Sequence, residues 1–196
     1  MSAQYTDLQL DALRELANIG SGTAGTSLSA MLGHSVDISV PNALVLPFAD
    51  AVEATGPAEA EVTGIVLGVF GDMTATVLLL IPPDDAGTMC RMLGLEPDDE
   101  YALSALGEIG NVVGSSYINA LAAMTGMAIE PTPPATATDM LGAIVQSVLA
   151  NHAAGGDVAL LLDSQLQVEG KDCSISFVLV PDAGGVDLLL ERLGMA

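Results

Sequence analysis

The feature that most constrains this chain is an internal repeat with a constant offset of 93 residues. When residues 10–33 are aligned with residues 103–126 without a gap, nine of the 24 positions are identical. Chance gives about one or two identities over such a length, and self-similarity at a fixed period is typical of a duplicated structural unit. We therefore expect two related helices placed around an approximate two-fold axis.

Each copy is predicted to form a long helix, because apolar residues recur in it at helical spacing. In the first copy Thr6 or Asp7 is expected to cap the helix and Gly33 to end it. In the second copy the expected cap is Asp98 or Asp99.

The two helices are predicted to bury one face each and to expose matching polar residues on the other. The predicted buried faces hold Leu13, Leu16, Ala17, Gly20, Ala24, Leu28 and Met31 in the first helix, and Leu106, Ile109, Gly110, Val113, Tyr117, Leu121 and Met124 in the second. Glu15 and Asn18 lie near the opposite side of the first helix. Glu108 and Asn111 occupy the equivalent positions of the second, so all four polar side chains are expected to face solvent.

The rest of the chain alternates strand patterns with short helices. Strands are predicted at residues 36–40, 43–48, 61–70, 74–81, 158–168 and 173–180, with hairpin turns at 71–72 and 169–171. Helices are predicted at residues 84–93 and 185–193, whereas residues 141–150 fit a helix or a strand. Residues 50–60 are predicted to form an exposed loop, and residues 131–138, with three prolines, a linker or an extended edge.

These patterns predict an α/β (α+β) fold. Residues 1–196 are expected to form a single domain from two repeats, at about 6–95 and 98–194. Its sheet is expected to be mixed or antiparallel, with the two long related helices on one exposed face.

The net charge of −21, from 25 acidic residues against four Lys and Arg, argues against nucleic acid and membranes as partners. No apolar run reaches the roughly 18 residues of a membrane-spanning helix, and the chain starts without a signal-peptide pattern. We therefore expect a cytoplasmic protein. Its composition, with dispersed acidic residues and little lysine, resembles that of proteins from salt-loving microbes. In such proteins salt screens the repulsion between carboxylates.

The chain offers few groups for metal binding or nucleophilic catalysis. Cys90 and Cys173 stand far apart without metal-ligand or redox spacing, and His34 and His152 are equally isolated. Neither a metal site nor a cofactor site is expected, and both cysteines are expected to be buried apolar side chains.

The candidate site is the duplicated Glu-x-x-Asn pair, formed by Glu15, Asn18, Glu108 and Asn111. Asn disfavours a helix interior by roughly a few tenths of a kcal/mol relative to better helix formers. An exposed Asn at both equivalent positions therefore favours a function. A pair that was duplicated without being used is the alternative.

A carboxylate and an amide without a metal or a nucleophile need a partner that completes a reactive centre. A receiver domain that holds an aspartyl phosphate supplies a strained acyl phosphate, a bound Mg²⁺ and a Lys. The Asn amide can then align a water for in-line attack, as Gln does in GTP hydrolysis. The Glu can pair with the receiver's Lys and so fix the docking register.

The two candidate sites differ in their neighbours. Arg14 precedes Glu15, whereas Gly107 precedes Glu108. The two faces are therefore electrostatically unequal, and the sequence leaves open which site is the stronger.

These motifs resemble those of the CheC, CheX and FliY family of chemotaxis phosphatases, whose signature is a Glu-x-x-Asn pair on a long exposed helix. The similarity runs from about Asp7 to Leu193 and includes both copies of the motif. Two complete signatures favour the CheC type, because a CheX-like protein is expected to have one functional signature. A FliY-like protein is expected to carry flagellar segments for which 196 residues leave no room.

The resemblance implies a protein aspartyl-phosphate phosphatase, a hydrolase that dephosphorylates a phosphorylated CheY-like receiver in archaeal or bacterial chemotaxis. It implies no cofactor of the chain's own, with Mg²⁺ supplied by the receiver, and it suggests association with the deamidase CheD. The main alternative is a non-catalytic adaptor that sequesters phospho-CheY or CheD. A structural part of the flagellar motor is a weaker alternative.

Overall fold

The chain folds around one antiparallel sheet, described by a computed structural model that covers residues 5–151, 158–168 and 171–195. The described helices are α1 (Asp7–Leu32), α2 (Phe48–Thr55), α3 (Pro83–Met92), α4 (Ala102–Thr125), α5 (Leu141–Asn151) and α6 (Gly185–Arg192). The described strands are β1 (Val36–Pro47), β2 (Glu61–Gly71), β3 (Ala75–Ile81), β4 (Ile129–Pro131), β5 (Ala135–Met140), β6 (Val158–Val168) and β7 (Lys171–Pro181). None of the helices in these ranges has the length and apolar character needed to cross a membrane.

The order of the strands reflects the internal repeat. The sheet runs β1-β6-β7-β3-β2-β4, and β5 pairs with the part of β2 that β4 leaves free. The first strand of each half therefore pairs with the hairpin of the other half, β1 with β6, and β4 and β5 with β2. Because of this exchange the two halves share one sheet.

Both edges of the sheet are interrupted at equivalent positions. The register of β1 against β6 shifts between Ser39 and Asn42. With the offset of 93 residues, the two residues between them correspond to residues 133–134, which lie between β4 and β5. The repeat thus extends from the helices into the edge strands, as a pseudo-two-fold arrangement requires.

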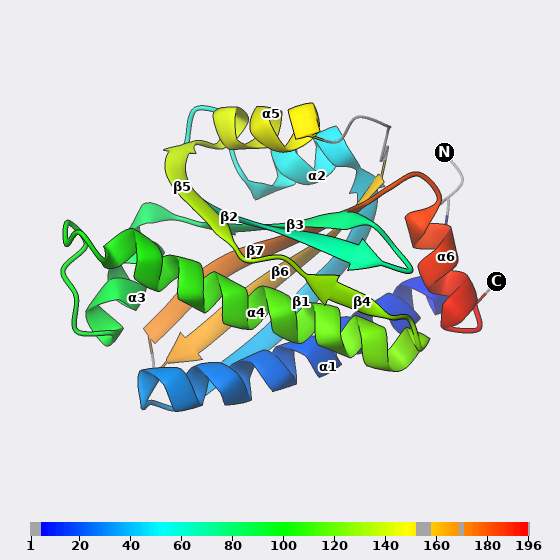
Figure 1. Ribbon diagram of the computed structural model, residues 1–196, viewed down its shortest axis with the longest axis horizontal. Coiled ribbons are helices and arrows are strands. Elements are labelled where there is room, and N and C mark those ends of the chain that lie inside the picture. Colours follow the sequence, from blue (N-terminus) through cyan, green and yellow to red (C-terminus); the bar gives the residue numbers. More distant parts are fainter. Residues whose placement is uncertain (1–4, 152–157, 169–170, 196) are drawn as a thin grey trace.

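Helices cover both faces of the sheet. α1 and α4 lie side by side and antiparallel on one face, while α2 and α5 cover the other (Figure 1). The larger apolar cluster packs α1 and α4 onto the sheet, and the smaller cluster packs α2 and α5 onto its opposite face. The predicted fold class is confirmed, and the sheet is antiparallel.

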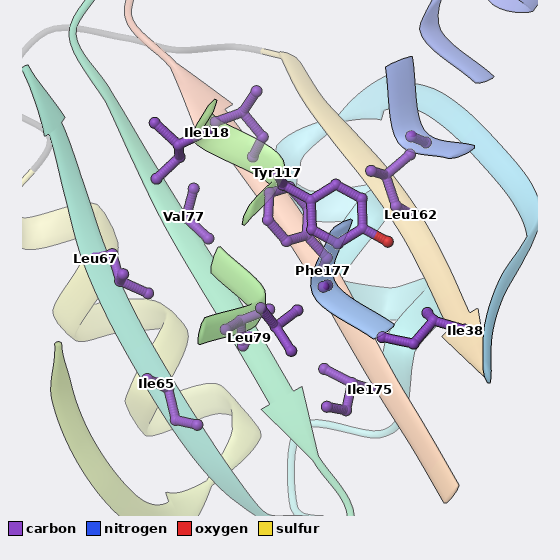
Figure 2. Packing of buried hydrophobic residues seen from close by; sticks show 14 of the residues in the cluster. Ile38, Ile65, Leu67, Val77, Leu79, Tyr117, Ile118, Leu162, Ile175 and Phe177 are labelled. Carbon is purple, nitrogen blue, oxygen red and sulfur yellow. The ribbon is translucent and has the colours of Figure 1, made fainter. Parts of the chain in front are cut away.

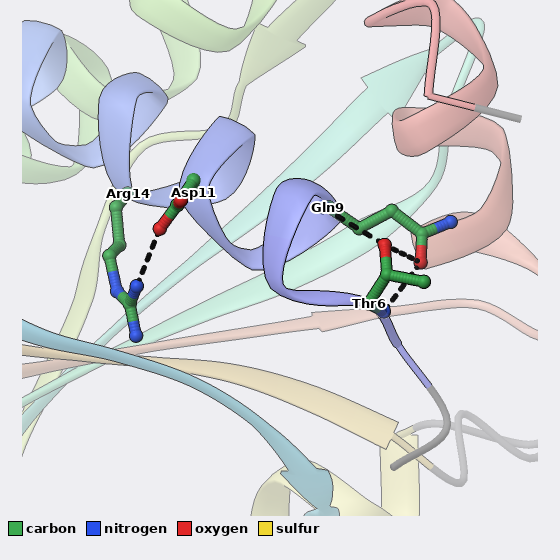
Figure 3. Close-up of polar contacts among 4 residues, drawn as sticks. All are labelled: Thr6, Gln9, Asp11 and Arg14. Atoms are coloured by element: carbon green, nitrogen blue, oxygen red, sulfur yellow. Dashed lines mark hydrogen bonds and ion pairs between the residues drawn. The ribbon is translucent and has the colours of Figure 1, made fainter.

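Helix α1 begins and ends as its sequence predicts. The Thr6 hydroxyl accepts from the Gln9 backbone N–H, and the Gln9 amide oxygen accepts from the Thr6 N–H, which forms a capping box (Figure 3). At the other end Gly33 has a φ of 70°, a left-handed conformation that glycine adopts without strain. Of the two predicted caps, Thr6 is therefore the one used.

Helix α4 begins later than predicted. Its N-cap is Tyr101, which makes no side-chain capping bond, so the prediction of Asp98 or Asp99 as the cap was wrong. The Asp99 Oδ1 instead accepts from the Tyr101 backbone N–H at 2.9 Å in the turn that leads into the helix. The Asp99 carboxylate, predicted to cap the helix, therefore stabilises the turn before the helix instead.

Four further segments either differ from the predictions or decide between the predicted alternatives. Residues 36–40 and 43–48, predicted as two strands, form most of the single strand β1, whose bulge produced the apparent gap. The loop predicted at residues 50–60 is wrong for residues 50–55, which belong to α2, where Phe48 and Ala51 are buried against the sheet. Residues 56–60 do form the connection between α2 and β2. Residues 131–138 form an edge of the sheet, and residues 141–150 are helical. Part of the second predicted hairpin turn, residues 169–170, lies outside the described residues.

A glycine on α1 allows α4 to place a large aromatic ring in the core. A Cβ on Gly20 would lie 2.5 Å from the Cδ1 of Tyr117. The Tyr117 ring packs against Phe177 (Figure 2), with 4.6 Å between the ring centroids. Its hydroxyl lies 3.1 Å from the Ser164 Oγ. Burial raises the pKa of the Tyr117 phenol, and the hydrogen bond to Ser164 opposes this rise.

Alanine at two glycines of α1 is expected to have opposite effects on stability. Gly20→Ala should lower the free energy of unfolding by about 1–2 kcal/mol, because overpacking against a fixed ring outweighs the gain of about 1 kcal/mol in helix propensity. Gly22→Ala is the matched control, since a Cβ there meets nothing within 4 Å. It should raise that free energy by up to about 1 kcal/mol. Urea unfolding of both variants is the test, and changes of the same sign would refute the packing argument.

Candidate functional site

Both Glu-x-x-Asn pairs lie on the helix faces that point away from the buried clusters. Glu15, Asn18 and Glu108 are exposed, and Asn111 is half-buried. The residues predicted to be buried on α1 and α4 are buried, except that the methionine near the end of each helix is half-buried and packs against the same core. The predicted solvent-facing position is confirmed for three of the four side chains and in part for Asn111.

Three of the four side chains are available to a partner. Within the part of the chain that the structure describes, the side chains of Glu15, Asn18 and Glu108 make no hydrogen bond or ion pair. The Asn18 backbone oxygen accepts from the Ser21 Oγ at 2.8 Å, but its amide is unengaged. A docking protein can therefore bind these groups without breaking internal bonds.

The amide of Asn111 is held more closely than that of Asn18. Its Oδ1 accepts a hydrogen bond from the Ser115 Oγ at 3.4 Å, which is long for such a bond and therefore weak. The position equivalent to Ser115 in the first copy is Gly22, which has no hydroxyl. The two sites thus present the same amide in different settings.

A surface hollow of about 440 Å³ adjoins the second pair. It is lined by Glu100, Leu103, Ser104, Gly107, Glu108, Pro134 and Thr136. Gly107 allows β5 to approach α4, because a Cβ there would lie 2.8 Å from the Thr136 Oγ1. The hollow therefore depends on the glycine that distinguishes the second copy from the first.

The first copy has Arg14 where the second has Gly107. The Arg14 Nη1 donates to the Asp11 Oδ1 at 2.6 Å, one turn earlier on the exposed side of α1 (Figure 3). The Arg14 charge is thus largely offset by its own helix. The inequality predicted from the sequence is present in the structure, as an ion pair beside one site and a hollow beside the other.

The two cysteines do not belong to the exposed candidate site. Cys90 and Cys173 are buried and form no disulfide within the described residues. Burial raises the pKa of the Cys90 thiol, and the charge of Arg91 opposes this rise. A thiol with a raised pKa is a poor nucleophile. In the described ranges no three His, Cys, Asp or Glu side chains gather closely enough to hold a metal ion.

The groups that surround Glu108 and Asn111 were not predicted from the sequence. No role was predicted for Ser115, and Pro134 and Thr136 fall in residues 131–138, which were predicted as a linker or an extended edge. A hydroxyl four residues after the Asn could have signalled the contact with Asn111, because such residues are neighbours on a helix surface. No local signal could have placed Thr136 against Gly107, since that contact joins distant parts of the chain.

Comparison with known proteins gives consistent matches. The model of the CheC-like family matches residues 8–45 and 102–137, which include both Glu-x-x-Asn pairs. The protein named CheY-P phosphatase CheC from Bacillus subtilis (strain 168) is 31% identical over an alignment of 196 positions. This alignment covers 95% of this chain and 94% of that protein. The flagellar motor switch phosphatase FliY of the same organism is 25% identical over 136 residues, 66% of this chain and 35% of that protein.

Among solved structures, FliY from Thermotoga maritima has a similar fold. The TM-score is 0.76 with 20% sequence identity, and the match covers 98% of each chain. At this identity the similarity establishes the shared fold.

Proposed function

Because this chain belongs to the CheC-like family, we propose that it hydrolyses the aspartyl phosphate of a CheY-like response regulator in chemotaxis signalling. The observation that supports this most directly is the exposure of Glu15, Asn18 and Glu108, whose side chains make no hydrogen bond or ion pair with the described part of the chain. The matching pair at Glu108 and Asn111 gives the chain two candidate sites. Both act in the cytoplasm, where the receiver is their partner.

In the proposed reaction Asn18 or Asn111 positions the attacking water. The amide oxygen accepts from the water and the amide N–H donates to it, which orients a lone pair toward phosphorus. The water oxygen forms the new P–O bond while the bond from phosphorus to the receiver's aspartate breaks. The products are a free carboxylate and inorganic phosphate, which takes up the proton that the water loses or passes it to solvent.

Glu15 and Glu108 anchor the receiver in this scheme. Each carboxylate lies one helical turn before its Asn and pairs with the receiver's active-site Lys, and the ion pair loses water as the surfaces meet. The Mg²⁺ that neutralises the phosphoryl oxygens is the receiver's own. This chain then contributes positioning and the docking register.

The reaction is distinguished from sequestration by turnover at low stoichiometry. Phosphate release should be measured from a phosphorylated CheY-like receiver present in large excess over this chain. A catalyst clears the whole pool faster than the receiver does alone. Loss of no more than one phosphate per binding site would instead identify an adaptor that sequesters its partner.

Binding of CheD is a separate proposal that rests on the family. Adding purified CheD to the same assay tests it, because a bound partner should change the rate of phosphate release or co-elute with this chain. Absence of both effects would remove CheD from the set of partners.

A further inference from the structure

Two large apolar side chains are exposed at equivalent positions of the two copies. Leu8 on α1 is 66% exposed, and Tyr101 at the start of α4 is 62% exposed. They are related by the same offset of 93 residues as the Glu-x-x-Asn pairs. Two different residue types thus provide the same property, exposed apolar surface, at the same place in both copies.

Each of these side chains is in line with the Glu of its own copy. Leu8 and Tyr101 precede Glu15 and Glu108 by seven residues, which is close to two turns of helix. Seven residues turn a helix to within about 20° of the starting direction and advance it by about 10 Å. Tyr101 has helical dihedral angles, φ −93° and ψ −7°, so this spacing also applies at the start of α4.

The distance of about 10 Å along the helix between each Glu and its apolar side chain fits within the contact area of a transient complex. Transient protein complexes bury up to about 1,200 Å² in total, so each partner covers a patch of roughly 14 Å radius. A patch centred on the Glu therefore reaches the apolar side chain two turns earlier. Interfaces place apolar and aromatic residues where they lose most water, and charged groups beside them set the register.

We propose that Leu8 and Tyr101 are apolar anchors for the CheY-like receiver, Leu8 for the site of Asn18 and Tyr101 for the site of Asn111. This proposal rests on the proposed function, because the receiver that the Glu engages is the occupant. The anchors lie too far from the Asn amides to touch the reacting atoms. They contribute to affinity and leave the chemical step unchanged.

The direct test is binding of a receiver that carries beryllofluoride, a stable mimic of its aspartyl phosphate. The double variant Leu8→Ser with Tyr101→Ser should bind it about three- to tenfold more weakly than the wild type. The control is Phe70→Ser, which removes an apolar side chain of similar exposure, 49%, from β2. It should bind as the wild type does. If the double variant bound the beryllofluoride-carrying receiver with unchanged affinity, the anchor proposal would be wrong, even if the wild type hydrolyses the phosphorylated receiver.

A second measurement assigns each anchor to its site. In a chain that carries Asn111→Ala, only the site of Asn18 can hydrolyse the aspartyl phosphate. Adding Leu8→Ser to that chain should therefore raise KM several-fold at constant kcat. With Asn18→Ala present, the same substitution should have no effect, and Tyr101→Ser should show the reverse pattern. An equal rise in both backgrounds would overturn the assignment.

The outcomes separate this proposal from the proposed function. A wild type that binds the mimic but never accelerates hydrolysis would refute the enzyme, whereas weaker binding by the double variant would still support the anchors. Sedimentation of the chain alone completes the test. If the double variant lost self-association and kept its affinity for the receiver, the exposed pair would be an interface between copies of this chain, and the anchor proposal would be wrong.

Discussion

Replacing Asn18 and Asn111 together by alanine is expected to return the loss of phosphate from a phospho-receiver to its unassisted rate. A misplaced reacting group costs about a hundredfold in rate, so removal of the positioning amide should abolish at least that much of the acceleration. Each single variant should keep part of the activity, because the other helix still carries a complete pair. Phosphate release at saturating receiver is the measurement.

The fold should tolerate these substitutions, which makes the result interpretable. Asn18 is exposed and its amide makes no hydrogen bond to any residue that the structure describes, and alanine favours a helix more than asparagine does. Gln146→Ala is a suitable control, because it removes an exposed carboxamide from α5 on the other face of the sheet. Full activity of the double variant would exclude the water-positioning mechanism. Loss of activity in the control would point to a general effect of the substitution.

The second large effect is a strong increase of thermal stability with salt. The net charge of −21 places 25 acids against four Lys and Arg, so most carboxylates have no cation to pair with. The Debye length falls from about 10 Å at 0.1 M salt to about 3 Å at 1 M, which removes most of the mutual repulsion in the folded state. We expect Tm to rise by about ten degrees or more between these concentrations of sodium chloride.

A charge-reduced variant tests the cause of this rise. Asp98 and Glu100 are exposed next to the start of α4, and changing both to lysine lowers the magnitude of the net charge by four. Because self-repulsion grows with the square of the charge, the salt-dependent part of Tm should shrink by about one third. If Tm rose with salt as much in the variant as in the wild type, salt would act through apolar surface instead of through charge. Calorimetry of both proteins at matched pH is sufficient.

The local pattern of the chain was enough to predict which faces of α1 and α4 are buried. A helix places residues three and four apart on one side, so the spacing of Leu13, Leu16 and Gly20 determines the direction of Glu15 and Asn18. The same reasoning applies to the second copy. The first hairpin was also predictable, because its strands are adjacent in sequence and its turn carries Gly71.

Segments whose structure depends on distant contacts were predicted less well. The eight residues of α2 are too few to show a helical period, and the helix is stabilised by packing Phe48 and Ala51 onto the far face of the sheet. The exchange of edge strands between the halves leaves no local signal, since β1 and β6 are more than a hundred residues apart. The duplication predicted two-fold symmetry without specifying which strands would pair.

The sequence by itself therefore determined the two Glu-x-x-Asn pairs, their equivalence and the outward direction of their helix face, because each follows from spacing within a single helix. Only the tertiary structure decided what surrounds the pairs. The Gly107 contact with Thr136, which shapes the hollow beside Glu108, joins α4 to an edge strand whose position is set by pairing with β2. Such contacts depend on how the whole chain packs, and short-range patterns carry no information about them.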